Sequence, residues 1–567
     1  MRPLLSISFC LAAAAPLLGQ SPTLLFTDSG TNDIDKMGYS VRTAGDLNGD
    51  KIPDYIYSAP FVDFPGRNNA GLVRVRSGAD HSLLYEFEGD NYQDEHGYSV
   101  GPAGDVNGDG FDDFLITQLI GSDNFTGSAE VHSGLDGSIL LQLFGNNIAY
   151  DFYGVSGAGV GDVNADGYDD VAIGAPAADP GGLYRAGEVT VYSGFDGSVI
   201  HLLVGPTRDQ QLGWFVDAVG DINGDGCSDF IAGAPTADSV NGVDSGAAYV
   251  YSGSDGSVLF TVVGDGAGDQ CGWCVSGAGD VNKDGVNDFM TGAPLANSNG
   301  TDAGTAKVYS GVDGSVLYTV TGDLAGDNMG WCVRNLGDLD GDGYGDFGAG
   351  AYLADVAGFT DAGVAKLFSG QTGSLIHAFE GASNNAHMGF TLGTAGDLNL
   401  DGFDEVILGA DFADVGGGVE AGILYVYELS PPASSPPVVF DRGAGCPGSN
   451  NKQPRADLFG RAALGEGYGV SLRGGFPSSS AVLNLGLEAT LPIGPFAPEC
   501  ELLVSPLFSA TLPTSAAGLA SVELFTNLPM NSSLIGVELH HQWVVVDPTN
   551  NLLGLSFSDD VATIVGN

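Results

Sequence analysis

Seven short acidic segments carry oxygen-bearing side chains at spacings that suit a hard metal cation. Each is a variant of GDxNxDGxxD, with carboxylate or amide side chains at the first, third, fifth and ninth positions counted from the first aspartate. Alternate side chains of a tight turn converge on one point, and Ca²⁺ prefers a shell of such oxygens. The predicted ligands are Asp46, Asn48, Asp50, Asp54, Asp105, Asn107, Asp109, Asp113, Asp162, Asn164, Asp166, Asp170, Asp221, Asn223, Asp225, Asp229, Asp280, Asn282, Asp284, Asp288, Asp338, Asp340, Asp342, Asp346, Asp397, Asn399, Asp401 and Glu405.

These segments predict up to seven structural Ca²⁺ sites, one in each loop. A glycine at the sixth position, such as Gly110, permits the turn, whereas the first loop has Lys51 there. An EF-hand shares the first half of the pattern but needs a glutamate at the twelfth position and flanking helices. Aliphatic residues such as Ile116 and Leu408 occupy the twelfth position, so an EF-hand is not expected. With a Kd of roughly 10⁻⁴ M, millimolar calcium adds about 1.4 kcal/mol per site, which makes the metal a structural one.

The acidic segments recur at a nearly constant interval, which indicates a repeat architecture. Subtracting the positions of their first aspartates gives spacings of 59, 57, 59, 59, 58 and 59 residues. Each unit has four short runs rich in β-branched and aromatic residues; in the fourth unit they occupy 213–219, 229–235, 246–253 and 257–264. Four antiparallel strands per unit, repeated seven times, predict an all-β chain with a seven-bladed β-propeller over residues 21–430.

The two ends of the repeat array predict how the ring closes. The seventh unit lacks a fourth run, while residues 23–30, before the first unit, resemble the fourth runs of other units. This N-terminal strand is expected to complete blade seven, so that no sheet edge stays open. A Pro/Ser-rich linker follows at 431–437, and residues 438–567 alternate apolar stretches with Gly, Pro and Asn turns. A small β-sandwich-like C-terminal domain is predicted there.

The N-terminus and the charge predict an extracellular protein. Residues 1–20 place Arg2 before an apolar run that ends in small residues, which is the layout of a secretory signal peptide. A lipid anchor at Cys10 is the disfavoured alternative, because the bulky Phe9 precedes it. No later stretch approaches the roughly 18 apolar residues that span a bilayer. The formal charge of −53 would repel nucleic acid phosphates and anionic lipids. We expect a secreted or cell-surface protein with no nucleic acid partner and no membrane span.

Two further motifs make the repeats resemble a known family. Gly-aromatic pairs open the first run of six units: Gly38-Tyr39, Gly97-Tyr98, Gly213-Trp214, Gly272-Trp273, Gly330-Trp331 and Gly389-Phe390. Gly-Ala-Pro triplets close the second run of three units, at 174–176, 233–235 and 292–294. In these features residues 23–429 resemble the FG-GAP repeats of integrin α-subunit propellers and their bacterial relatives, although the third unit reads Phe152-Tyr153-Gly154 instead. The resemblance implies calcium-binding loops on a propeller that serves as a binding platform, and it names no ligand.

Binding has more support in the sequence than catalysis. Cys271-Gly-Trp-Cys274 has thioredoxin-like spacing, but it begins a predicted strand rather than a helix, so a redox role is not expected. The histidines are scattered, and the calcium loops account for many of the acids. We therefore expect a binding or adhesion platform for an extracellular protein or glycan, not an enzyme. The alternatives are a polysaccharide-active lyase or hydrolase and a structural surface-layer protein. Cys446 and Cys500, alone in the C-terminal domain, are a candidate disulfide.

Strand parity predicts the face of the propeller that meets a partner. In an up-and-down blade the calcium loops join the first and second strands, so they share a face with the hairpins between the third and fourth strands. The opposite face collects the longer connections, and variable loops on a rigid scaffold commonly carry recognition. Aromatic and arginine side chains make the strongest interface contacts. The candidate ligand-face residues are Phe64, Arg67, Phe125, Tyr184, Arg185 and Phe359.

Overall fold

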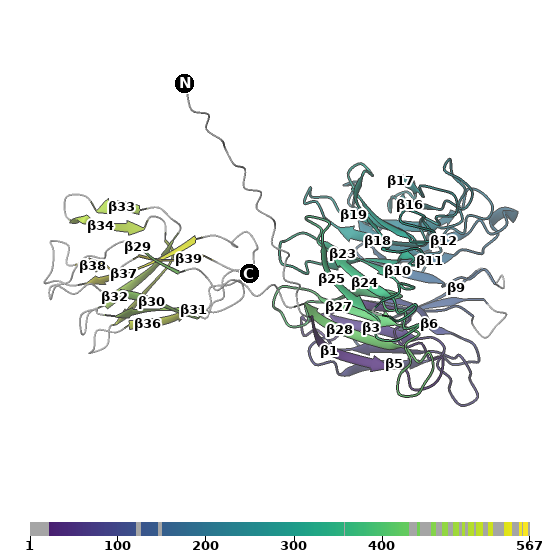
Figure 1. The fold of residues 1–567 in the computed structure, drawn as a ribbon, viewed down its shortest axis with the longest axis horizontal. Helices are drawn as coiled ribbons and strands as arrows, with labels where there is room; N and C mark the ends of the chain where they lie inside the picture. The colour runs from purple at the N-terminus through teal and green to yellow at the C-terminus, as the bar shows by residue number, and fades with distance from the viewer. Residues whose placement is uncertain are drawn as a thin grey trace, which may run out of the picture.

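A computed structural model describes residues 22–120, 126–145, 150–356 and 358–429 in full; in the C-terminal region it describes only the backbone of the strands. Strands β1 to β28 form seven four-stranded antiparallel sheets arranged as a β-propeller (Figure 1). This confirms the predicted seven-bladed all-β fold. The signal peptide predicted at 1–20 lies outside the described residues.

Blades one to six each run from an inner strand to an outer strand in chain order, and blade seven takes its outer strand from the N-terminus. Blades one to three contain β2 (Val41–Gly45), β3 (Asp54–Ala59), β4 (Leu72–Arg76), β5 (Leu83–Glu88), β6 (His96–Gly104), β7 (Asp113–Gln118), β8 (Ser128–His132), β9 (Ile139–Phe144), β10 (Ser156–Gly161), β11 (Asp170–Ala175), β12 (Glu188–Tyr192) and β13 (Val199–Val204). Blades four to six contain β14 (Val216–Gly220), β15 (Asp229–Ala234), β16 (Ala247–Tyr251), β17 (Val258–Val263), β18 (Cys274–Gly279), β19 (Asp288–Ala293), β20 (Thr305–Tyr309), β21 (Val316–Thr321), β22 (Met329–Gly337), β23 (Asp346–Ala351), β24 (Val364–Phe368) and β25 (Leu375–Glu380). Blade seven contains β26 (Thr391–Gly396), β27 (Glu405–Ala410), β28 (Ile423–Leu429) and β1 (Pro22–Ser29).

The hydrophobic core lies between neighbouring blades. Successive residues of a strand point to opposite faces of its sheet, so the second strand of each blade packs against two neighbours. In β15, Phe230 joins a cluster that contains Val189 of blade three, whereas the next residue, Ile231, joins a cluster that contains Phe289 of blade five. Every residue of β15 is buried, while the outer strand β17 begins with the exposed Val258. The burial pattern explains why the second runs are almost wholly apolar or small.

The connections between strands divide between the two faces of the propeller. On one face, the N–H of Gly78 in the β4–β5 hairpin donates to the Asp54 carboxylate, 3.0 Å away, at the end of the β2–β3 loop. On the other face, the link into blade one runs beside the β27–β28 loop, where Met37 forms a bridge with Gly422. The acidic loops and the tight hairpins therefore share one face, here called the metal-loop face. The longer connections occupy the other, here called the ligand face.

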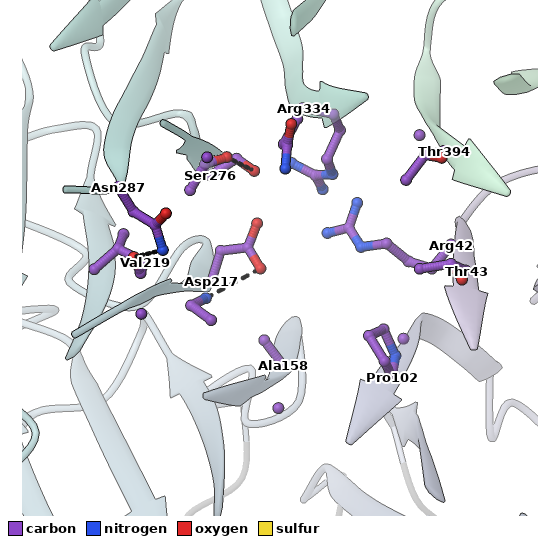
Figure 2. A pocket seen from close by; sticks show the side chains of 18 of the residues that line it. Arg42, Thr43, Pro102, Ala158, Asp217, Val219, Ser276, Asn287, Arg334 and Thr394 are labelled. Atoms are coloured by element: carbon purple, nitrogen blue, oxygen red, sulfur yellow. Dashed lines mark hydrogen bonds between the residues drawn. The ribbon is translucent and has the colours of Figure 1, made fainter. Parts of the chain in front are cut away.

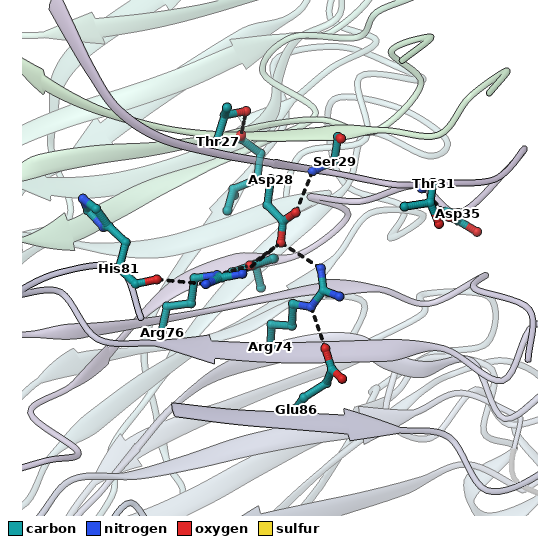
Figure 3. A network of polar contacts seen from close by, with 11 residues as sticks. Thr27, Asp28, Ser29, Thr31, Asp35, Arg74, Arg76, His81 and Glu86 are labelled. Carbon is teal, nitrogen blue, oxygen red and sulfur yellow. Dashed lines mark hydrogen bonds and ion pairs between the residues drawn. The ribbon is translucent and has the colours of Figure 1, made fainter. Parts of the chain in front are cut away.

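The N-terminal strand closes the ring. β1 pairs antiparallel with β28 and supplies the outer strand of blade seven. Asp28 of β1 also reaches Arg74 and Arg76 of blade one (Figure 3). Its Oδ2 pairs with Arg74 at 2.8 Å and accepts a hydrogen bond from the hydroxyl of Tyr57 at 2.6 Å. Arg76 lies 3.5 Å from the same oxygen. One carboxylate therefore joins the first and last blades, in addition to the backbone pairing.

The described part of the C-terminal region consists of strands. They are β29 (Val439–Arg442), β30 (Arg455–Gly460), β31 (Tyr468–Arg473), β32 (Ser480–Gly486), β33 (Thr490–Ile493), β34 (Ala497–Leu503), β35 (Pro506–Pro513), β36 (Ala520–Leu524), β37 (Glu538–Val546), β38 (Leu555–Phe557) and β39 (Asp560–Ile564). One sheet has the order β29-β39-β37-β32-β35 with β38 beside β37, a second has the order β30-β31-β36, and β33 pairs with β34. The packing of these sheets as a sandwich remains a prediction.

Candidate calcium loops and binding face

A glycine bulge at the end of each inner strand directs the chain into the acidic loop. The register of the pairing shifts just before this glycine in each of the seven blades. Its φ angle lies between 69° and 82°, a region that glycine enters without steric cost. The first aspartate of the loop follows at once, so its position is set by the bulge. The glycines are Gly45, Gly104, Gly161, Gly220, Gly279, Gly337 and Gly396.

Inside each loop the side chains at the first and fifth positions accept backbone hydrogen bonds, and in six of the seven loops the third position does so as well. In the second loop, Asp105 accepts from Gly108 at 2.7 Å, from Asp109 at 3.1 Å and from Gly110 at 2.9 Å. Asn107 accepts from Asp109 at 2.8 Å, so the third position faces the same turn. The same set recurs in the fourth loop, and most of it recurs in the others. The predicted ligands at these positions therefore lie on the inner side of one tight turn.

The carboxylate at the ninth position is buried and holds two segments together. Asp113 accepts from the N–H of Val106 at 3.0 Å and from the N–H of Gly134, in the β8–β9 hairpin, at 3.0 Å. Six loops share this arrangement, through Asp54, Asp113, Asp170, Asp229, Asp288 and Asp346. In the seventh loop Glu405 accepts from the N–H of Leu398 at 2.6 Å. These residues were predicted as metal ligands alone, and in the structure they also connect the acidic loop to the neighbouring hairpin.

The sixth loop shows best that these residues fit a cation. Asp338, Asp340 and Asp346 each offer a carboxylate oxygen, and the three oxygens lie within 4.8 Å of one another. Burial, and then the negative charge of Asp340, raises the pKa of Asp346 to about 8. A cation among these oxygens would offset both effects, and an all-oxygen donor set suits Ca²⁺ better than a transition metal. When bound, calcium would offset part of the loop's negative charge, with the first, third, fifth and ninth side chains holding it.

Two backbone features of the loops were not predicted from the sequence. The fourth position has a positive φ in all seven loops, including three that lack glycine there: Ala165 at 57°, Lys283 at 57° and Leu400 at 58°. The sixth position of the first loop, Lys51, also keeps a positive φ, 71°. The left-handed region costs roughly 1–2 kcal/mol for such residues. The loops therefore keep one conformation even where the residue type opposes it, and Lys51 does not change the turn.

Neighbouring acidic loops are joined by the residue at the eighth position. Asp112 accepts a hydrogen bond from the backbone N–H of Asp46, in the preceding blade, at 3.0 Å. Asp169 accepts one from the N–H of Asp105 at 2.9 Å. The eighth position was not among the predicted ligands. These contacts link the first three loops around the metal-loop face.

The aromatic residues of the Gly-aromatic pairs form an arc around the central axis on the ligand face. Neighbouring ring centroids in the arc lie between 4.7 and 5.8 Å apart. Blade three contributes Val155 at this level, while its Tyr153 is buried and its hydroxyl donates to that of Tyr192 at 3.0 Å. The departure seen in the third repeat therefore interrupts the arc. The residues of the arc are Tyr98, Tyr39, Phe390, Trp331, Trp273 and Trp214.

The structure places the candidate ligand-face residues in three different loops of that face. Arg67 pairs with Glu88 at 2.8 Å and lies over the ring of Phe64, so both already have partners within blade one. Tyr184 is 52% exposed, and Phe359 is 38% exposed. The side chain of Arg185 lines a cleft between blades three and four. Phe125 lies outside the described residues.

The cysteine pair at the start of β18 is buried. Burial raises the pKa of the Cys271 thiol to about 11 and holds that of Cys274 well above its ordinary value. A reactive cysteine needs the opposite shift. The described cysteines, including Cys227 and Cys332, are free. The side chains of Cys446 and Cys500 lie outside the described residues, so their pairing stays a prediction.

The repeats of the propeller are similar to repeats of known proteins. The FG-GAP repeat family matches residues 153–192, 213–251, 275–309 and 388–427, within blades three, four, five and seven. Over 222 residues, 36% of this chain, the sequence is 31% identical to integrin alpha-5 of Xenopus laevis. It is 33% identical to integrin alpha-8 of Mus musculus over 171 residues, 29% of this chain, and 29% identical to integrin alpha-V of Gallus gallus over 232 residues, 38% of this chain. The matches span between 15% and 21% of the length of these relatives.

Proposed function

This chain carries an FG-GAP repeat propeller similar to that of integrin α chains, and from this premise we propose that it is a calcium-stabilised binding platform for an extracellular protein or glycan. Its role is adhesion or recognition rather than catalysis. Within the described residues, no helix has the length and hydrophobicity to cross a membrane. Secretion through the N-terminal segment accords with the acidic composition, because extracellular calcium would then reach the loops.

The observation that carries the proposal is a cleft of about 580 Å³ on the ligand face between blades three and four. Arg185 and Arg208 line one part of it, and Asp238 and Asp244 line another. Arg208 is exposed, pairs with Asp209 at 2.9 Å and lies 5.9 Å from the ring of Tyr184. Exposed charged groups beside an aromatic face provide hydrogen bonds and stacking for a polar ligand such as a glycan.

The division between the two faces supports the same reading. On the metal-loop face, buried carboxylates fix short loops to tight hairpins, so the scaffold there is rigid. On the ligand face, the β11–β12 connection contains the short 3-10 helix η1 (Pro180–Gly182) and ends in exposed side chains such as Leu183 and Tyr184. Recognition commonly uses loops that a rigid scaffold presents.

The test is a glycan and protein array probed with the full-length secreted chain in millimolar calcium. We expect selective binding that Tyr184→Ala and Arg185→Ala weaken by about tenfold or more, because aromatic and arginine contacts dominate interfaces. The matched control is Phe195→Ala: this aromatic residue is 63% exposed and follows the other end of β12, on the metal-loop face. If Phe195→Ala loses as much binding affinity as the other two variants, the site lies on the metal-loop face. If the chain degrades a polysaccharide, the enzyme alternative is favoured instead.

A further inference from the structure

One level of the propeller's central channel has an unusual set of side chains. Each inner strand places one residue there, four positions before the first aspartate of its acidic loop. All seven residues line a cavity of about 430 Å³ on the channel axis. In blade order they are Arg42, Gly101, Ala158, Asp217, Ser276, Arg334 and Gly393.

Three charged side chains meet in this cavity. Figure 2 shows the guanidinium groups of Arg42 from β2 and Arg334 from β22, and the carboxyl group of Asp217 from β14, pointing toward the middle of the channel. Among the described residues that line the cavity, these are the charged ones. Two arginines and one aspartate give the lumen a formal charge of +1, in a protein whose formal charge is −53. The channel is therefore locally basic inside an acidic molecule.

The two arginines have unused hydrogen-bonding capacity. Arg334 is only 5% exposed, and its Nε has no hydrogen-bond partner within the described part of the chain. Its Nη1 donates to the carbonyl of Val333 at 2.6 Å. Arg42 is half-buried, and no hydrogen bond or ion pair is found for it among the described residues. A buried donor without an acceptor is costly, so an acceptor from outside the chain would be favourable here.

Phe215 holds the two guanidinium groups in place. Its ring lies 4.6 Å from the guanidinium carbon of Arg334 and 5.9 Å from that of Arg42. The cation–π contacts leave the N–H donors of Arg42 free to face the lumen. The Nη1 of Arg334 is occupied by the carbonyl of Val333 and by the Sγ of Cys274 at 3.2 Å, so Arg334 offers its unpartnered Nε. Asp217 is the acidic group that faces Arg42 across the lumen: burial raises the pKa of Asp217, while the charge of Arg42 and hydrogen bonds with Ser276 and with the N–H of Ala218 at 3.1 Å act in the opposite direction.

We propose that this channel binds a small organic carboxylate, such as a hydroxy acid or a sugar acid, through Arg42 and Arg334. A planar carboxylate matches the fork of donors on a guanidinium group. Its single negative charge neutralises the lumen, whereas a divalent sulfate or phosphate would leave it negative within an acidic protein. Ser276 and Thr394 line the same cavity. Their hydroxyls already donate to the carbonyls of Gly277 at 2.8 Å and Glu405 at 3.3 Å, so toward a ligand hydroxyl they would act as acceptors.

The space for such a ligand results from small residues at the same level. Gly101, Ala158 and Gly393 replace larger side chains in blades two, three and seven. The cavity volume falls within the roughly 300–1,000 Å³ of small-molecule sites. Lining residues such as Gly220 and Gly279 immediately precede acidic loops, so this chamber lies toward the metal-loop face. It is thus separate from the cleft that we propose on the ligand face.

The test is calorimetric titration of the full-length calcium-loaded chain with acetate, lactate and glucuronate, and with glucose and sulfate for comparison. We expect one carboxylate per chain, with little binding of glucose or sulfate. Arg42→Gln should weaken binding by about tenfold or more, since hydrogen bonds to charged groups are strong. Lys366→Gln removes one positive charge outside the channel, where Lys366 pairs with Asp323 at 2.7 Å, and should leave the affinity unchanged.

A second variant separates charge recognition from folding. Asp217→Asn removes the only acid of the cavity lining in the described chain and should raise carboxylate affinity severalfold, which a purely structural role of the arginines would not cause. Arg334→Gln should weaken carboxylate binding as Arg42→Gln does, but it replaces a buried side chain. If that variant fails to fold, Arg42→Gln and Asp217→Asn still test the carboxylate site. The proposal is overturned if none of the three carboxylates binds at millimolar concentration, if Arg42→Gln binds them undiminished, or if sulfate binds as tightly as they do.

Discussion

Replacing Asp288 with alanine would separate the two roles of an acidic loop. Asp288 is the buried ninth residue of the fifth loop, and it accepts hydrogen bonds from the N–H groups of Val281 and Gly311, each at 3.0 Å. Asp284, at the fifth position of the same loop, is exposed. If both residues are calcium ligands, Asp288→Ala and Asp284→Ala should each abolish calcium binding in the fifth loop. Only Asp288→Ala should also destabilise the chain without calcium.

The magnitudes follow from these contacts. Asp288→Ala leaves two buried N–H groups without an acceptor, at about 1–3 kcal/mol each, so the calcium-free chain should lose about 2–6 kcal/mol. With an unfolding entropy of about 2.1 cal/mol/K per residue over roughly 400 residues, the Tm falls by about 2–7 °C. Asp284→Ala should cost less than about 0.5 kcal/mol without calcium, as for other exposed positions. In millimolar calcium it should lose about 1.4 kcal/mol, the stabilisation from one site with a Kd of roughly 10⁻⁴ M.

Scanning calorimetry of wild type and both variants, each in EDTA and in 1 mM calcium (about tenfold above the assumed Kd), measures these differences. The control is Asp313→Ala, an exposed aspartate in the β20–β21 hairpin whose carboxylate accepts from the N–H of Ser315 at 2.9 Å. The reasoning is refuted if Asp288→Ala melts with wild type in EDTA, because its carboxylate would then not link loop and hairpin. If calcium stabilises Asp284→Ala as much as wild type, the fifth position is not a ligand.

Three further outcomes are expected. Chelation by EDTA should lower the Tm of the full chain and added calcium should restore it; an unchanged melting curve with no metal by elemental analysis contradicts the seven sites. Asp28→Ala should destabilise ring closure by about 1–3 kcal/mol, because Tyr57, Arg74 and Arg76 lose their shared acceptor; hydrogen exchange in β28 should rise, while equal protection in both proteins would mean that the backbone pairing with β1 suffices. His96 is buried and its pKa is lowered to about 4, mainly by desolvation, so the unfolded state takes up a proton below its own pKa of about 6.5 and the folded state does not. Stability should therefore fall as the pH drops from 6.5 toward 4, by about 2 kcal/mol at pH 5; His96→Gln should lack this component in denaturant titrations, and parallel pH profiles would exclude it.

Much of the fold is readable from local features of the sequence. The acidic segments recur seven times at a nearly constant interval, the Gly-aromatic pairs recur six times, and strand-like runs recur in every unit, so these signals reinforce one another. Within a loop, the side chains of Asp105, Asn107 and Asp109 accept hydrogen bonds from residues a few places away. Short-range geometry of this kind depends on spacing alone, so the candidate ligands could be named without coordinates.

The remaining features depend on contacts between segments far apart in the sequence. Asp28, on the outer strand of blade seven, pairs with Arg74 of blade one, and Asp113 binds the N–H of Gly134 in the β8–β9 hairpin. Neither contact follows from a local sequence pattern. Arg42 and Arg334 are separated by most of the propeller in sequence, yet both line the same cavity. The sequence by itself determines the repeat, the strands and the acidic loops, because those follow from neighbouring residues. Only the tertiary structure decides which of the 18 basic and 71 acidic residues meet, because closing the ring brings one residue from every blade to the same axis.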